Sequence, residues 1–269
     1  MRNAPIHTCR MADPVRTGSG PQSDGDHGFL TVTDDRLELR FEAPGGPRPL
    51  YVDFVNGPLG YARRVNRFGS LFDAIGFRRG RPTVFDVTAG LGADAFRLAY
   101  HGCRVTAIER SEIVFKLLED GLRRALGVPE VQVQLQDRLT LVHADARDIL
   151  RQLAPHEGTP IRDSLAGARV SRTTASRSRL PATAAPDVVY IDPMYPPRKK
   201  SALAKIELRI LRQIVGDDPD APELFRLARA VARQRVVVKR PRHAEPLGPS
   251  PSHSHDDQST RYDVYVQSG

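Results

Sequence analysis

The stretch Thr83-Val84-Phe85-Asp86-Val87-Thr88-Ala89-Gly90-Leu91-Gly92-Ala93-Asp94 decides the fold. Its β-branched and aromatic start predicts a strand that stops at Asp86, and residues 93–100 have the composition of a helix. Gly90 and Gly92 carry no Cβ and tolerate positive φ, so the backbone between strand and helix can approach a ligand closely. The unpaired N–H groups of a helix start also face such a ligand. The stretch therefore predicts a strand, a glycine turn and a helix that hold a nucleotide-like cofactor.

The details of the turn bear on which cofactor it holds. In the dinucleotide fingerprint a third glycine follows three residues after the second, and here Ala95 has that place. The spacing Asp86-x-x-x-Gly90-x-Gly92 resembles motif I of class I methyltransferases, which bind S-adenosylmethionine. On this stretch alone, an ordinary strand-to-helix turn without a ligand stays open.

Composition limits the class of protein. The chain has 269 residues, a formal charge of +8, and 40 basic residues of which all but five are arginine. Such a surface attracts phosphate, so nucleic acid is an expected partner. The two cysteines indicate neither a disulfide framework nor a metal cluster, and no run is long enough to cross a membrane. We expect a cytoplasmic monomer with no membrane partner and no metal.

The chain divides into three parts by pattern. Residues 1–28, rich in Gly, Pro, Ser and Asp, predict a disordered leader. Residues 29–80 predict a small β-containing extension on the substrate side, which begins with a hairpin over 29–41. Residues 81–269 alternate strands with helices, which predicts an α/β Rossmann-like methyltransferase domain with a parallel sheet and helices on both faces. Within it, 155–186 is low in apolar residues and predicts a mobile insertion.

Acids stand at the ends of the first three predicted strands of this domain. The strands are expected at 83–85, 103–108, 139–143, 187–191 and 235–238, with a last edge strand at 261–266. Ligands of such sheets lie beyond the carboxyl ends of the strands, where Asp86, Glu109 and Asp145 fall. Glu109 is placed to accept hydrogen bonds from two ribose hydroxyls. Asp145 either accepts from an adenine amine or simply caps the next helix.

The tetrapeptide Asp192-Pro193-Met194-Tyr195 follows the fourth strand. Asp/Asn-Pro-Pro-Tyr/Phe at this place is typical of methyltransferases that act on exocyclic amines of bases. The Asp192 side chain and the Pro193 carbonyl would orient the amine, whose lone pair is otherwise delocalised, and Tyr195 would stack on an extruded base. The alternative is a strand that ends in a Pro-rich turn.

Three basic clusters are candidates for contacts to RNA phosphates. They consist of Arg63, Arg64 and Arg67, of Arg198, Lys199 and Lys200, and of Lys239 and Arg240. The last two clusters follow strands and are expected to surround the opening of the same ligand site. A plain solvated surface is the alternative for each cluster.

Taken together, the motifs resemble the bacterial ribosomal RNA small subunit methyltransferase J family over about residues 29–266. The matching blocks are Tyr51-Val52-Asp53-Phe54-Val55, Asp86 to Phe96, Gly102 to Val105 with Glu109-Arg110, Asp192 to Pro196, Lys200 to Leu203 and Val236 to Pro241. The resemblance implies methyl transfer from S-adenosylmethionine to the N2 amine of a guanosine in 16S rRNA or the small ribosomal subunit. It implies cofactor contacts at Ala93, Asp94, Glu109, Arg110, Asp145, Ala146 and Asp192, beside Asp86, Gly90 and Gly92 of the turn.

Other functions stay open at this point. A methyltransferase for another nucleic-acid amine, such as adenine N6, would share the tetrapeptide. A non-catalytic RNA-binding or assembly factor would share the fold. A nicotinamide-dependent oxidoreductase is disfavoured, because the third glycine is missing and no acid or base for hydride transfer is evident.

Overall fold

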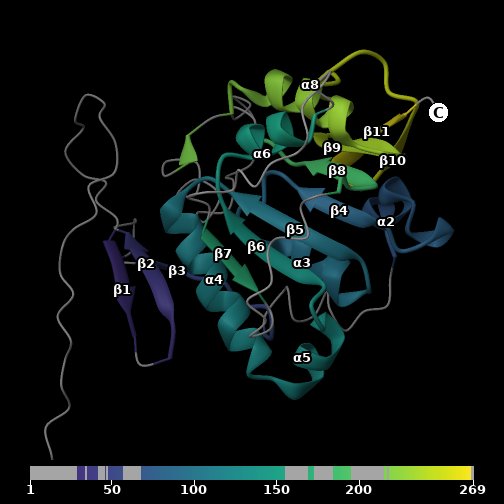
Figure 1. Ribbon diagram of the computed structural model, residues 1–269. Coiled ribbons are helices and arrows are strands. Elements are labelled where there is room, and N and C mark those ends of the chain that lie inside the picture. The colour runs from purple at the N-terminus through teal and green to yellow at the C-terminus, as the bar shows by residue number, and fades with distance from the viewer. Residues whose placement is uncertain are drawn as a thin grey trace, which may run out of the picture.

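The computed structural model describes residues 29–33, 35–41, 46, 48–56, 68–154, 169–172, 184–194, 215–216 and 218–267 (Figure 1). The predicted leader 1–28 lies outside these residues, as does most of the predicted insertion 155–186. The predictions of disorder and mobility for them are therefore untested.

A central sheet of eight strands organises the described chain, in the order β10-β11-β9-β8-β4-β5-β6-β7. Five neighbouring strands are parallel: β4 (Thr83–Asp86), β5 (Arg104–Glu109), β6 (Leu139–His143), β8 (Val188–Ile191) and β9 (Arg235–Pro241). The flanking strands β7 (Arg169–Arg172), β11 (Thr260–Val266) and β10 (His253–Asp256) are antiparallel. The Rossmann-like architecture is confirmed, with a mixed sheet in place of a purely parallel one.

Helices cover both faces of the sheet (Figure 1). One face carries α3 (Ala93–Tyr100), α4 (Glu112–Leu126) and α5 (Pro129–Leu135), and the other carries α6 (Ala146–Leu153) and α8 (Ala221–Val231). Each face has its own hydrophobic core, because the parallel strands send buried side chains to both sides. A short helix, α2 (Ser70–Ile75), and the 3₁₀ turn η1 (Phe77–Arg79) precede β4.

The C-terminal strand pairing differs from the prediction. Residues 260–266 form an interior strand, because β10 pairs beyond them and takes the edge. No strand was predicted at β10, since His253-Ser254-His255-Asp256 lacks the alternating apolar residues of a strand. Neither face of β10 is buried, so the strand does not need the apolar residues that a buried face requires.

The N-terminal extension forms a separate three-stranded antiparallel sheet of β1 (Phe29–Val32), β2 (Leu37–Phe41) and β3 (Arg48–Leu50). The predicted hairpin is confirmed, and a third short strand, β3, pairs with β2. Residues after β3 join the core of the main domain: the Phe54 ring stacks on Phe96 of α3, with centroids 4.2 Å apart. The domain division near residue 81 stays a prediction.

The strand order reverses between β4 and β8, and this places the two predicted motifs side by side. From β4 the chain proceeds outward through β5 and β6, and it then returns to β8 on the other side of β4. The glycine turn after β4 and the segment Asp192–Met194 after β8 therefore leave adjacent strands at the same edge of the sheet. Such a switch point is where open α/β sheets bind ligands.

The two glycines of the turn adopt left-handed φ angles, +54° at Gly90 and +76° at Gly92. A Cβ at Gly92 would lie 2.4 Å from Leu118 Cδ1 and 3.2 Å from Phe54 Cζ. A Cβ at Gly90 would meet only Thr88 O, at 4.0 Å. Gly92 is thus required by backbone and packing together, and Gly90 by the backbone alone.

This difference gives a matched pair of variants. We expect Gly90→Ala to lower the free energy of unfolding by about 1–2 kcal/mol, the cost of a left-handed alanine. Gly92→Ala should cost about 2–4 kcal/mol, because the displacement of Leu118 adds to that strain. Urea unfolding without cofactor measures both, and equal losses would contradict the packing argument.

Candidate active site

A cleft that is partly open to solvent lies at the carboxyl ends of β4, β5, β6 and β8. Its described lining residues include Thr88, Gly90, Glu109, Arg110, Asp145, Ala146, Arg147, Asp192, Met194, Asp218 and Asp220. Five of these are acids and two are arginines, so the cleft is acidic in a protein whose overall charge is positive. An acidic cleft favours a cationic ligand.

Glu109 joins the glycine turn to the next strand. Its carboxylate accepts a hydrogen bond from the Gly90 N–H at 2.8 Å and another from the Ser111 N–H at 2.7 Å. Burial raises the pKa of Glu109, and these two hydrogen bonds oppose the rise. Ser111 caps α4 by accepting a hydrogen bond from the Val114 N–H. Glu109 is thus held in a fixed orientation in the cleft wall.

Asp145 caps α6, which is the simpler of its two predicted roles. Its carboxylate accepts from the Arg147 N–H at 2.9 Å and from the Arg147 guanidinium at 2.6 Å. The hydrogen bonds from the Arg147 side chain lower the pKa of Asp145. Asp145 also lines the cleft, so a contact to an adenine amine stays a prediction.

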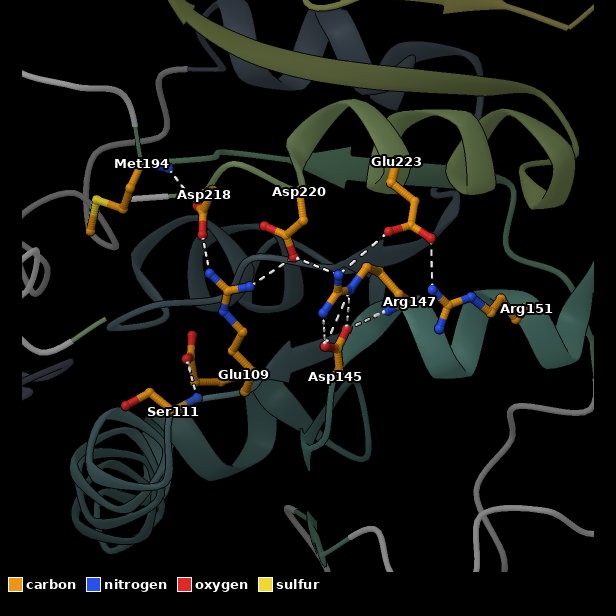
Figure 2. Close-up of polar contacts among 10 residues, drawn as sticks. Glu109, Ser111, Asp145, Arg147, Arg151, Met194, Asp218, Asp220 and Glu223 are labelled. Carbon is orange, nitrogen blue, oxygen red and sulfur yellow. Dashed lines mark hydrogen bonds and ion pairs between the residues drawn. The ribbon is translucent and has the colours of Figure 1, made fainter. Parts of the chain in front are cut away.

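A chain of ion pairs connects the strand ends to the start of α8 (Figure 2). Arg110, after β5, pairs with Asp218 and, at 2.8 Å, with Asp220. Arg147 pairs with Asp220 at 3.3 Å and with Glu223 at 3.4 Å. The segment that enters α8 is thereby held against β5 and α6 along the cleft.

The acids of this segment were not among the residues predicted from the sequence. The signal available was the run Asp217-Asp218-Pro219-Asp220, which precedes a helix with Pro222 in its first turn. Acids before a proline-started helix read as ordinary capping residues. Nothing in the local pattern shows that Arg110, more than a hundred residues earlier, pairs with them.

The backbone around Asp192 is held from both sides. The Asp192 N–H donates to Thr88 Oγ1 of the glycine turn at 2.6 Å, and the Met194 N–H donates to Asp218 Oδ2 at 2.7 Å. Pro193 between them is buried. The predicted amine-orienting segment therefore has a fixed backbone, anchored to the cofactor turn and to the segment before α8.

Beside Asp192 lies a cluster of charged side chains that are partly or fully covered. Lys239 Nζ of β9 lies 2.8 Å from Asp192 Oδ2 and 3.0 Å from Asp94 Oδ2 at the start of α3. Asp94 also accepts from the Tyr190 hydroxyl at 2.7 Å. Asp86, which is 2% exposed, belongs to the same cluster. Burial first and the charge of Asp94 second raise the Asp86 pKa well above its ordinary value.

The structure brings most predicted cofactor residues together. Gly90, Glu109, Arg110, Asp145, Ala146 and Asp192 line the cleft. Asp86, Gly92, Ala93 and Asp94 belong to the strand end, the turn and the first helical turn beside it. Tyr195 and the predicted RNA contacts Arg63, Arg64, Arg67, Arg198, Lys199 and Lys200 lie outside the described residues.

The remaining two predicted RNA contacts, Lys239 and Arg240, are placed differently from expectation. Lys239 points into the charge cluster, and Arg240 is buried with its guanidinium bonded to the Glu245 carbonyl. Both lie on β9, whose consecutive side chains project to opposite faces of the sheet, and a hydrophobic core covers each face. We therefore no longer propose them as phosphate ligands.

The described residues contain neither a metal-binding cluster nor a membrane-spanning helix. Within these residues, no group of three or more His, Cys, Asp or Glu side chains could hold a metal ion. None of the helices in the same part of the chain has the length and apolarity to cross a membrane.

The buried Asp86 gives a prediction about stability. Because its pKa is higher in the folded than in the unfolded protein, its contribution to stability falls as pH rises from the ordinary carboxyl pKa through the folded-state value. Asn can accept the same hydrogen bond from the Thr88 N–H without a charge. We expect Asp86→Asn to raise Tm at pH 8 by roughly 3 °C, with the gain shrinking toward about pH 4.

Thermal unfolding at both pH values tests this, with Asp148→Asn as the control because the Asp148 side chain is 64% exposed. An Asp86→Asn protein that is less stable than the parent at pH 8 would contradict the argument.

The comparisons with known proteins agree with this geometry. The family model described as "Putative SAM-dependent methyltransferase" matches residues 20–161 and 164–267. The ribosomal RNA small subunit methyltransferase J of Thioalkalivibrio sulfidiphilus is 44% identical, covering 91% of this chain and 87% of the relative. That of Pectobacterium atrosepticum is 40% identical, covering 88% and 86%.

A solved structure shows the same fold. The crystal structure of a SAM-dependent methyltransferase from Neisseria gonorrhoeae matches with a TM-score of 0.63 and 32% identity, covering 93% of this chain and 86% of that chain. With a family model over most of its length and relatives above 40% identity, this chain belongs to the ribosomal RNA small subunit methyltransferase J family of SAM-dependent methyltransferases.

Proposed function

We propose that this protein transfers a methyl group from S-adenosylmethionine to the N2 amine of a guanosine in 16S rRNA. One observation carries the proposal: an acidic cofactor cleft opens beside an Asp192 whose backbone is fixed by the glycine turn. Family membership supplies the class of reaction and the class of RNA.

The residues of the cleft fit S-adenosylmethionine. This cofactor carries a sulfonium and an ammonium group and has no pyrophosphate, so five acids against two arginines suit it better than they suit a dinucleotide. Glu109 would accept hydrogen bonds from the ribose hydroxyls, and Gly90 lines the cleft without a side chain. The bound cofactor supplies an electrophilic methyl group.

Asp192 and Pro193 would orient the amine of the target base. The lone pair of the guanine amine is delocalised into the ring, and an acceptor pair can hold the two N–H groups so that the lone pair faces the methyl carbon. The Asp192 carboxylate and the Pro193 carbonyl form such a pair at the end of β8. Tyr195 would stack on the extruded base. Positioning therefore matters more here than a strong base.

The other hypotheses receive less support. An adenine-N6 methyltransferase would use the same acceptor pair, but the relatives are named as ribosomal RNA methyltransferases. A non-catalytic factor would not need an anchored Asp192 beside an acidic cleft. We also propose that the enzyme works as a monomer in the cytoplasm. Arg63, Arg64, Arg67, Arg198, Lys199 and Lys200 remain our candidates for the RNA contacts.

Labelled S-adenosylmethionine and small ribosomal subunits that lack the modification test the function. We expect label in 16S rRNA and N2-methylguanosine after nucleoside digestion. Label in N6-methyladenosine would favour the adenine alternative. Cofactor binding without transfer to any RNA or DNA substrate would favour the non-catalytic one.

Asp192→Ala tests the mechanism. We expect transfer to fall by at least about 100-fold, because the amine loses its acceptor. Asp148→Ala, which removes an exposed carboxylate from α6, is the matched control and should keep the parental rate. The rate is measured by label transfer at saturating cofactor and RNA. A folded Asp192→Ala enzyme with a normal rate would contradict the assigned role.

A further inference from the structure

Lys239 joins three elements that meet at the switch point. It lies on β9, and its ammonium contacts Asp192 after β8 at 2.8 Å and Asp94 at the start of α3 at 3.0 Å. Asp94 follows the glycine turn within two residues of Gly92. One ammonium group therefore bridges the acid expected to hold the target amine and the helix that begins at the cofactor turn.

The three side chains of this bridge differ in how much of each is exposed to solvent. The Lys239 side chain is 24% exposed and the Asp94 side chain 14%, whereas that of Asp192 is 37% exposed. The bridge is thus mostly covered, and Asp192 keeps an accessible side. Lys239 can hold one carboxylate oxygen of Asp192 while a substrate N–H approaches the rest of the group.

The acidic groups around Lys239 favour its charged, ammonium form. The groups that face it are Asp86 of β4, Asp94 and Arg97 of α3, Tyr190 and Asp192 of β8 and its end, Asp218 before α8, and Tyr262 of β11. Burial disfavours a charged Lys239, but the carboxylates of Asp192 and Asp94 outweigh burial and raise its pKa. Burial also raises the pKa of Asp192, and Lys239 opposes that rise.

We propose that Lys239 is a positioning residue for methyl transfer: its ammonium fixes the Asp192 carboxylate in its charged form and ties it to the glycine turn through Asp94. The proposal rests on the proposed function, since it acts through Asp192. Lys239 makes and breaks no covalent bond. Its effect is to keep the acceptor for the target amine ionised and at a constant distance from the cofactor turn.

A different role was predicted from the sequence, namely a contact to RNA phosphate. The two roles make different demands. A phosphate ligand contributes to RNA affinity and to its salt dependence, whereas a positioning residue contributes to the rate at saturating RNA. Kinetics and binding therefore separate them.

The decisive variant is Lys239→Gln in the full chain. At neutral pH we expect kcat to fall roughly 100-fold, while the KM for RNA changes less than about threefold. Activity requires ionised Asp192, so it is lost as pH falls through the Asp192 pKa. Without Lys239 that pKa rises, and the acid limb of the kcat profile should move to higher pH.

Two further variants control this experiment. Arg242→Gln removes a half-exposed positive charge just beyond β9, whose nearest paired acid is Asp256 at 3.8 Å, and it should leave kcat and the acid limb unchanged. Lys239→Arg keeps the charge and should return the acid limb toward the parental pH with an intermediate kcat. Circular dichroism and calorimetric binding of S-adenosylmethionine confirm that each variant is folded.

Several outcomes would overturn the proposal. An unchanged kcat with weaker, less salt-dependent RNA binding would assign Lys239 to phosphate. A folded Lys239→Arg enzyme as inactive as Lys239→Gln, or a Lys239→Gln enzyme with the parental acid limb, would show that the charge does not act through Asp192. If Lys239→Gln does not fold, the pH of the acid limb in the kcat profile of Lys239→Arg is the remaining test of the proposal. Failure of the parent enzyme to methylate RNA would instead refute the proposed function.

Discussion

The parallel pairing of β4 with β8 is the constraint on which the site depends. Phe85 lies opposite Val189 and Asp86 opposite Tyr190, and the ladder continues past the strand with a hydrogen bond from the Val87 N–H to the Tyr190 carbonyl. Beyond it, Thr88 Oγ1 accepts from the Asp192 N–H. Because these contacts belong to or extend the backbone ladder, the register of two core strands sets the distance between the glycine turn and Asp192. A change in that register would separate cofactor from substrate.

The same pairing concentrates negative charge. Asp86, Asp94 and Asp192 meet where β4, α3 and β8 converge, and Asp86 is 2% exposed. Carboxylates at such a place repel one another and lose hydration, which costs stability. The proposed function accounts for this cost, since it brings a cationic cofactor and a hydrogen-bond-donating amine to these acids. Lys239 offsets part of it from the neighbouring strand, at the point where two of the acids would otherwise face each other.

Sequence predicted the parts of this arrangement that depend on local chemistry. Strand composition and glycine spacing are local signals, so the strand, the turn and the helix after it agree with expectation. Pairings between distant segments carry no local signal. From the sequence, Lys239 is a basic residue at the end of an apolar strand, which indicates an exposed side chain. Its direction toward Asp94 and Asp192 is set by the pleat of β9. Asp218 reads as a capping acid, although it bonds to Arg110 and Met194.

The distribution of charge also explains how one small protein serves two ligands of opposite sign. A net charge of +8 attracts RNA over the surface as a whole, whereas the cofactor cleft has five acids against two arginines. Each ligand is thus drawn to the region that repels the other, and RNA phosphates are kept out of the cofactor cleft. The two regions must meet at one point, since the methyl group passes from one ligand to the other. We propose that this point is Asp192, where the acceptor for the target amine carries a negative charge within an RNA-attracting surface. The direct contact with the Lys239 ammonium offsets that charge.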